Sequence, residues 1–150
     1  MIKDFPLNEI ILRRYEKPYQ LDDRELFKKI CLSLGFLQVG DSRDIIVDIL
    51  MILNKASKDK TELNSEEIKN KVIEARQKNK LELKGIADSN IRRQLKRLRD
   101  AMIIEKIDNY YRMNEFSKLS EIFENKIEKF LLPQILERIK EYLQELEKRQ

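Results

Sequence analysis

The chain of 150 residues contains no histidine, no tryptophan, one cysteine, three glycines and three prolines. Without histidine, neither a Ser–His or Cys–His nucleophilic pair nor a histidine-ligated zinc site can form. A lone cysteine excludes an intrachain disulfide and a thiolate cluster. That cysteine, Cys31, lies in an apolar run, so a buried structural thiol is favoured over a reactive one. With so few glycines, there is no Gly-rich phosphate loop.

Paired carboxylates are the remaining candidates for catalysis. Asp22–Asp23 and Glu66–Glu67 are adjacent in sequence, so their side chains diverge around a helix. Both pairs also stand where acidic residues favour the start of a helix. We therefore predict that the protein is not an enzyme and uses no cofactor and no metal.

Long apolar runs are also missing. No uninterrupted apolar segment is long enough to cross a bilayer, and no apolar core follows Met1–Pro6 as it would in a secretion signal. We expect a cytoplasmic, nucleoid-associated protein with no membrane partner. Charged residues make up 39% of the chain. This Lys- and Glu-rich composition resembles that of hyperthermophile proteins, and also the output of an AT-rich genome.

The positive charge is concentrated in the middle of the chain. Residues 41–114 contain 17 cationic and 13 anionic side chains, against 7 and 6 in residues 1–40 and 7 and 8 in residues 115–150. Three regions are therefore expected: an N-terminal helical extension, a central domain and a C-terminal helical segment. A net charge of +4 favours an acidic partner.

Apolar spacing predicts a mainly helical fold with one small β-hairpin. Helices are expected weakly over residues 7–15, and more clearly over 21–35, 42–56, 65–77 and 89–101. From Ser117 onward the chain reads as helical to near its end, with Leu119, Phe123, Ile127 and Phe130 on one stripe. Pro133 is expected to break or kink that run.

The helix expected over residues 89–101 is the most informative element. Between Ser89 and Arg99 it has five positive charges and no negative one. Its apolar residues fall on a single stripe, which packs inward, so the cationic side chains point outward. Charged helix faces are usually solvated surface, but the other helices of this chain mix both signs. A purely cationic face suits a phosphate-lined groove.

A hairpin is expected next. Met102–Ile107 is β-branched and apolar, Asp108–Asn109 tolerates a turn, and Tyr110–Met113 can return as a second strand. Asn109 has no glycine beside it, so the turn type is left open. Tyr110 and Tyr111 point to opposite faces of a strand, which leaves one in the core and one exposed.

This order of three helices and a hairpin resembles a winged helix-turn-helix domain. The pattern runs from Ser89 through Leu95, Leu98 and Ile103 to Tyr110 and, in outline, looks like regulators of the MarR, PadR and TrmB kinds. It covers about half of the chain. Two features depart from it: the link Gln77–Ile86 is long, and residues 1–40 match no such family.

The resemblance implies double-stranded DNA as the partner, with the third helix in the major groove. Ser89, Asn90 and Arg93 would then face base edges. Phosphates would be contacted by a further set of residues, namely Arg92, Lys96 and Arg97. Lys106, Asn109 and Arg112 of the wing would touch a neighbouring groove or the backbone.

The C-terminal apolar residues have a coiled-coil spacing of alternating four and three. They are Leu132, Leu136, Ile139, Leu143 and Leu146. This helix either folds back on the domain or pairs with its copy in a second chain. A homodimer is the favoured interpretation, with the N-terminal helices sharing the interface.

The sequence thus predicts a dimeric, sequence-specific DNA-binding protein, most simply a transcriptional regulator. The alternative is a winged-helix scaffold that binds proteins in a transcription, replication or other intracellular complex. A small-molecule effector is unidentified. The N-terminal aromatic residues that could line a pocket for one are Phe5, Tyr15, Tyr19, Phe27 and Phe36, which are more often simple core.

Overall fold

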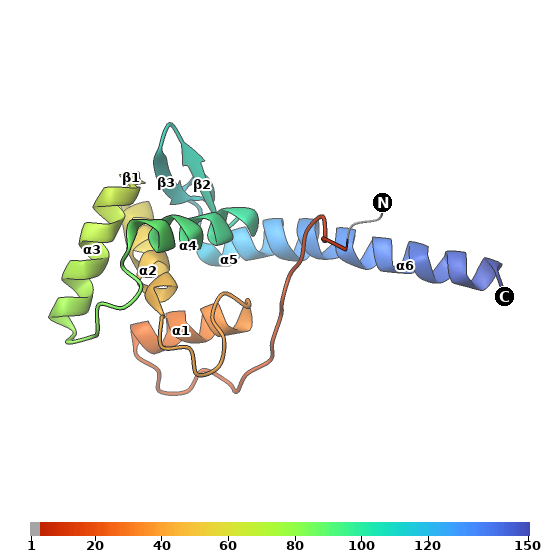
Figure 1. The fold of residues 1–150 in the computed structure, drawn as a ribbon, viewed down its shortest axis with the longest axis horizontal. Helices are drawn as coiled ribbons and strands as arrows, with labels where there is room; N and C mark the ends of the chain where they lie inside the picture. The colour runs from red at the N-terminus through yellow and green to blue at the C-terminus, as the bar shows by residue number, and fades with distance from the viewer. Residues whose placement is uncertain (1–3) are drawn as a thin grey trace.

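A computed structural model describes residues 4–150 (Figure 1). The elements are, in order, α1 (Asp23–Ser33), α2 (Ile45–Lys58), β1 (Leu63–Asn64), α3 (Ser65–Lys78), α4 (Asp88–Asp100), β2 (Ile104–Ile107), β3 (Tyr110–Met113), the 3₁₀ turn η1 (Asn114–Phe116), α5 (Leu119–Ile122), the π-helical η2 (Phe123–Leu131) and α6 (Leu132–Lys148). The predicted class is confirmed at this level: mainly helical, with a small antiparallel sheet and a long C-terminal helix.

Helix α2 is the centre of the hydrophobic core. Ile45, Ile49, Leu50 and Leu53 are fully buried, and α2 packs against α1, α3, α4 and β3. Because every turn of α2 has apolar side chains on more than one face, it can be covered from several sides at once. This explains why α2 holds together elements on both sides of it in sequence.

Helix α3 begins with a reciprocal cap. The side chain of Asn64 accepts from the Glu67 amide (2.8 Å), and the Glu67 carboxylate accepts from the Asn64 amide (3.1 Å). Both contacts satisfy amides that have no partner within the helix. The predicted start of α3 at residue 65 is therefore confirmed.

The sheet has three strands rather than the predicted two. Strand order is β1-β3-β2, all antiparallel, with Leu63 opposite Tyr111 and Ile104 opposite Met113. Strand β1 contains two residues, too few for any periodicity to reveal it. It brings the end of α2 against the hairpin and so ties the hairpin to the helices.

The hairpin turn is defined by two consecutive left-handed residues. Asp108 has φ 50° and Asn109 has φ 68°, the combination of a type I′ turn, which matches the twist of the flanking strands. Asn and Asp tolerate this conformation without a glycine. Tyr111 is 5% exposed and Tyr110 is 42% exposed, so the predicted division of the two tyrosines is confirmed.

The helix predicted over residues 7–15 is wrong. This segment, here called the N-terminal arm (residues 4–14), is not helical and runs along the body of the protein (Figure 1). Arg13 holds it by donating to the carbonyl oxygens of Leu32 (2.9 Å) and Leu37 (3.2 Å). Ile11 lies so close to Gly35 that a Cβ on that residue would be 2.5 Å from Ile11 Cβ. These tertiary contacts outweigh a weak helical preference.

The C-terminal helical run continues through Pro133, so of the predicted break or kink, the break does not occur. Leu132 donates its amide to the carbonyl of Ile127, five residues earlier, as in a π-helix. The wider winding changes the stripe: Leu131, not Phe130, is buried after Ile127. Beyond this point α6 extends away from the body (Figure 1).

None of the described helices has the length and apolarity needed to cross a membrane.

Candidate nucleic-acid interface

Helix α4 is anchored along one side. Ile91, Leu95 and Leu98 are buried against the core, and α4 contacts α2, α3 and β2. At its first turn, Asp88 pairs with Lys69 of α3 (2.8 Å), which lowers the pKa of the Asp88 carboxyl through that hydrogen bond. The orientation of α4 is therefore set by apolar packing along its length and by an ion pair at its start.

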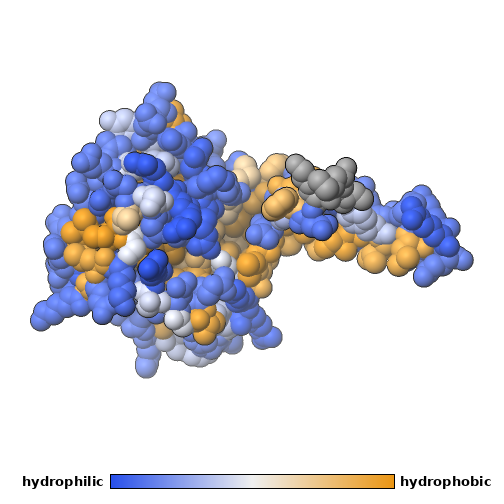
Figure 2. Space-filling view, in the orientation of Figure 1, coloured by the Kyte–Doolittle hydropathy of each residue, from blue (hydrophilic) through white to orange (hydrophobic). Residues whose placement is uncertain are grey.

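The opposite side of α4 is exposed and cationic. Ser89, Arg92, Arg93, Lys96 and Arg99 are all exposed, and Figure 2 shows strongly hydrophilic residues gathered over this helix. Within residues 4–150, Arg92, Arg93 and Arg99 form no salt bridge with a carboxylate. We use the name α4 face for the five exposed residues Ser89, Arg92, Arg93, Lys96 and Arg99. Arg99 was not among the residues proposed from the sequence.

Asn90 does not belong to the α4 face, which corrects its predicted role as a base reader. It is 7% exposed, and its Nδ2 donates to the carbonyl of Gly85 (2.7 Å). Its Oδ1 accepts from Arg93 (2.8 Å) and Gln94 (3.0 Å). Asn90 thus closes the long link before α4 and orients Arg93, and it does so because a buried amide must find partners.

Lys96 is exposed as predicted, but Arg97 is less available than its sequence position suggested. Lys96 pairs with Asp100 one turn later (3.0 Å), although both side chains remain exposed. Arg97 is half-buried: it donates to the carbonyl of Gly35 (3.2 Å) and lies over the ring of Phe36. Arg97 therefore joins α4 to the turn after α1, and the predicted phosphate contact does not fit this position.

The predicted DNA-contacting residues of the β2–β3 hairpin also differ in exposure. Lys106 and Asn109 are exposed near its tip. Arg112 is instead half-buried, where it pairs with Glu105, lies 3.8 Å from the carboxylate of Glu62 and stacks on Phe116. Its predicted DNA contact is corrected: Arg112 joins β3 to β2 and to the residue before β1.

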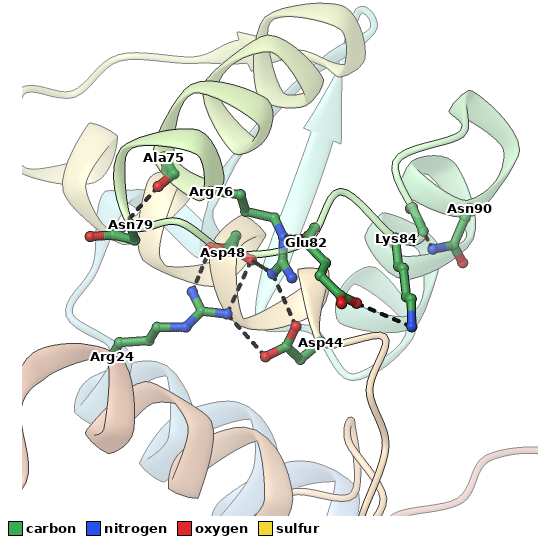
Figure 3. Close-up of polar contacts among 10 residues, drawn as sticks. Arg24, Asp44, Asp48, Ala75, Arg76, Asn79, Glu82, Lys84 and Asn90 are labelled. Carbon is green, nitrogen blue, oxygen red and sulfur yellow. Dashed lines mark hydrogen bonds and ion pairs between the residues drawn. The ribbon is translucent and has the colours of Figure 1, made fainter.

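A partly buried cluster of four charged residues was not predicted from the sequence (Figure 3). Arg76 of α3 donates to Asp44 (3.0 Å) and Asp48 (2.7 Å), and Arg24 of α1 donates to the same two carboxylates. Asp48 and Arg76 are each only 3% exposed. One signal was present in the sequence: Asp48 is the single charged residue in the otherwise apolar run 45–53.

This Arg24–Asp44–Asp48–Arg76 cluster fastens three helices at one point. Burial alone would raise the pKa of Asp44, but hydrogen bonds from Arg76 and Arg24 more than offset this, and the pKa is lowered. The Nε of Arg76 also donates to the carbonyl of Glu82 (2.6 Å), in the link between α3 and α4. The cluster thereby supports the link that leads into α4.

The predicted dimerisation residues lie on one exposed stripe of α6. Leu136, Ile139, Leu143 and Leu146 are between 47% and 52% exposed, and Leu132 is half-buried at the junction with η2. Figure 2 shows apolar residues continuing along this helix. The alternative in which α6 folds back on its own domain does not occur.

The N-terminal aromatic residues do not gather around one cavity. Tyr15 borders an apolar groove between α1 and α5, of about 500 Å³, whereas Phe36 borders a different one. Phe27 is packed against the core, and Phe5 and Tyr19 are exposed.

Burial raises the pKa of the Cys31 thiol to about 12, in agreement with its predicted structural role.

Comparison with models of protein families, with curated proteins and with solved structures gives no match for this chain. The α4 face must therefore be interpreted from its own geometry. Within residues 4–150, no three His, Cys, Asp or Glu side chains are grouped as a metal site would require.

Proposed function

We propose that this protein binds double-stranded DNA, with α4 in the major groove, and acts as a transcriptional regulator. The observation that carries the proposal is the α4 face: five exposed residues, four of them cationic, on a helix whose other side is fixed to the core. An α-helix fits the width of the major groove, and its cations meet the phosphates on either side.

The arrangement around α4 supports this placement. The order α2, β1, α3, α4, β2, β3, with β3 in the middle of the sheet, resembles that of a winged helix-turn-helix domain. In such a domain α4 is the recognition helix and the β2–β3 hairpin is the wing. The type I′ turn places Lys106 and Asn109 near the tip of that wing.

The contacts around each side chain divide the proposed roles. Ser89 and Arg93 lie in the first turns of α4 and are assigned to base edges, with Arg93 oriented by Asn90. Arg92, Lys96 and Arg99 are assigned to phosphates, which fix position without reading sequence.

The first test measures binding of the full chain to a labelled generic DNA duplex. Fluorescence anisotropy is the readout, and the titration is repeated across a salt series. We expect affinity to fall steeply as salt rises, because cations on α4 would displace counterions from the phosphates. No binding even at low salt would overturn the proposal and direct attention to a protein partner, as expected for a scaffold module.

Two variants separate base reading from phosphate contact. After a preferred site has been selected, Arg93→Ala should reduce discrimination against single-base changes by about 1–3 kcal/mol. Lys96→Ala should weaken binding to all sequences alike and reduce the salt slope by about one. Lys55→Ala, which removes an exposed cation of α2, is the control and should change neither quantity. A uniform loss in the Arg93 variant would remove its base-reading role.

A further inference from the structure

We propose that the exposed apolar stripe of α6 is the contact surface for a second copy of this chain, and that the N-terminal arm of each copy forms the edge of that contact. The proposal concerns a surface distant from the α4 face in sequence and does not depend on DNA binding. It rests on the width of the stripe, the charges beside it, its length and the position of the arm.

The stripe is wider than a two-stranded seam requires. Leu132, Leu136, Ile139, Leu143 and Leu146 occupy the two heptad positions that face a partner helix. Ile135 and Tyr142 add a third position beside them, and Tyr142 is 71% exposed. A helix with three apolar positions per heptad is covered by more than one neighbour. A partner helix would cover the first two positions and leave the third to another segment.

The N-terminal arm is placed to supply that segment. Asn8 donates to Gln134 at the start of α6 (3.4 Å), and residues 6–11 form one wall of a groove of about 540 Å³ whose other wall includes Ile127 and Leu131. Phe5 and Leu7 are more than 80% exposed. In a pair of chains, these side chains would pack beside Ile135 and Tyr142.

The polar side of α6 favours a protein partner over a membrane surface. Its charges are balanced, with four carboxylates and four cations from residues 134 to 149, and two of the pairs are joined within the helix: Arg138 with Glu141 and Arg149 with Glu145. Helices that lie on membranes are instead rich in Lys and Arg on their polar side. A neutral, regular stripe can also meet its own copy without like-charge repulsion.

The length of the stripe suits a second copy of the same helix. Residues 132–146 span about 21 Å at 1.5 Å per residue. Leu136, Ile139, Leu143 and Leu146 are each between 47% and 52% exposed along that length. A second α6 has the same length and the same apolar spacing, so it can cover the stripe from end to end.

Sedimentation equilibrium of the full chain without DNA tests the proposal. We expect twice the mass of one chain for the unmodified protein. Leu143→Glu should weaken the pair by at least about a hundredfold, because the pairing would bury an unpaired carboxylate. Gln144→Glu introduces the same charge at the next residue, outside the stripe, and should leave the mass unchanged. We expect both variants to keep their helices, because the substituted positions of α6 are exposed. Circular dichroism checks this.

The arm is tested separately with Leu7→Glu, which should weaken the pair by less than Leu143→Glu but measurably. A single-chain mass for the unmodified protein at all concentrations would overturn the proposal, as would equal masses for Leu143→Glu and Gln144→Glu or a four-chain assembly. An unchanged dissociation constant for Leu7→Glu would remove the arm from the interface. None of these outcomes bears on the salt dependence of DNA binding, so the two proposals can fail independently.

Discussion

Arginine has opposite surroundings in two regions of this protein. In the Arg24–Asp44–Asp48–Arg76 cluster, each arginine contacts two carboxylates, and Arg76 is almost completely buried. On the α4 face, Arg92, Arg93 and Arg99 are exposed and form no salt bridge within residues 4–150. The two regions have the same side chain and differ in the carboxylates around it.

This difference shows which cations are available to a ligand. A buried guanidinium must be paired, because an uncompensated charge away from water is costly. An exposed guanidinium with no carboxylate beside it is available to bind an anionic partner from solution. The comparison also accounts for Arg97 of α4 and Arg112 of the hairpin. Both were predicted to contact DNA, but they contact other parts of the protein. The number of cations in a segment is thus a poor guide to its binding surface.

The largest effect is expected from removing one arginine of the cluster. Arg76→Ala would leave Asp48 buried with Arg24 alone and would leave the Glu82 carbonyl without its donor. We expect the free energy of unfolding to fall by about 3–5 kcal/mol. Urea denaturation monitored by circular dichroism measures this change.

Arg93→Ala is the matched control for that experiment, because it removes the same side chain from the exposed face. Its free energy of unfolding should stay within about 0.5 kcal/mol of the unmodified protein. Equal losses in the two variants would show that the arginines of both regions are structural, and the comparison would fail.

Periodicity predicted most of the fold and little of the detail. The extents of α1 to α4 and the hairpin followed from apolar spacing, because it is a local signal. Strand β1 and the N-terminal arm did not, because both depend on partners far away in the sequence: β1 pairs with Tyr110 and Tyr111, and Arg13 binds carbonyls of the turn after α1. Tertiary contacts decide such segments.

The candidate site was predicted only in part for a similar reason. The cationic side of α4 followed from its helical spacing, and Ser89, Arg92, Arg93 and Lys96 are exposed as expected. Asn90 is turned toward Gly85 in the link before α4, which helical spacing from α4 alone does not reveal. For the same reason, sequence could not show that Arg97 contacts the Gly35 carbonyl or that Arg112 pairs with Glu105.

Acid provides a second test of the cluster, smaller than loss of Arg76 because Asp44 is more exposed than Asp48. Burial opposes ionisation of Asp44, but Arg76 and Arg24 more than compensate and hold its pKa below the ordinary value. Its stabilising contribution is therefore complete above the unfolded-state pKa of about 3.9 and is lost as pH falls through the lower folded-state pKa. Urea unfolding from neutral pH to about pH 3 follows this loss.

Asp44→Asn is the control for the acid series, since it removes the titrating carboxyl while preserving its shape. The difference in stability between the two proteins should be constant from neutral pH to about pH 5 and should shrink as the solution becomes more acidic. A difference that stayed constant through the acid range would contradict the lowered pKa of Asp44.

The smallest change in stability is expected from adding a carboxylate to the α4 face. Ser89→Glu would place an acid in the first turn of α4, four residues before Arg93, where both the helix dipole and the pairing are favourable. We expect the free energy of unfolding to rise by about 0.3–0.5 kcal/mol. Affinity for DNA should nevertheless fall, because the new carboxylate neutralises Arg93 and repels phosphate.

Ser89→Gln has the same length without the charge, and anisotropy at fixed salt compares the two variants. If α4 enters the groove by its first turns, the Glu variant should bind about tenfold or more weakly than the Gln variant, although it is the more stable protein. This opposition distinguishes a ligand surface from a structural one: in the cluster, carboxylates strengthen the fold and compete with nothing. Equal DNA affinities for the two variants would mean that Ser89 and Arg93 lie away from the DNA, and the α4 face would have to bind by its later turns.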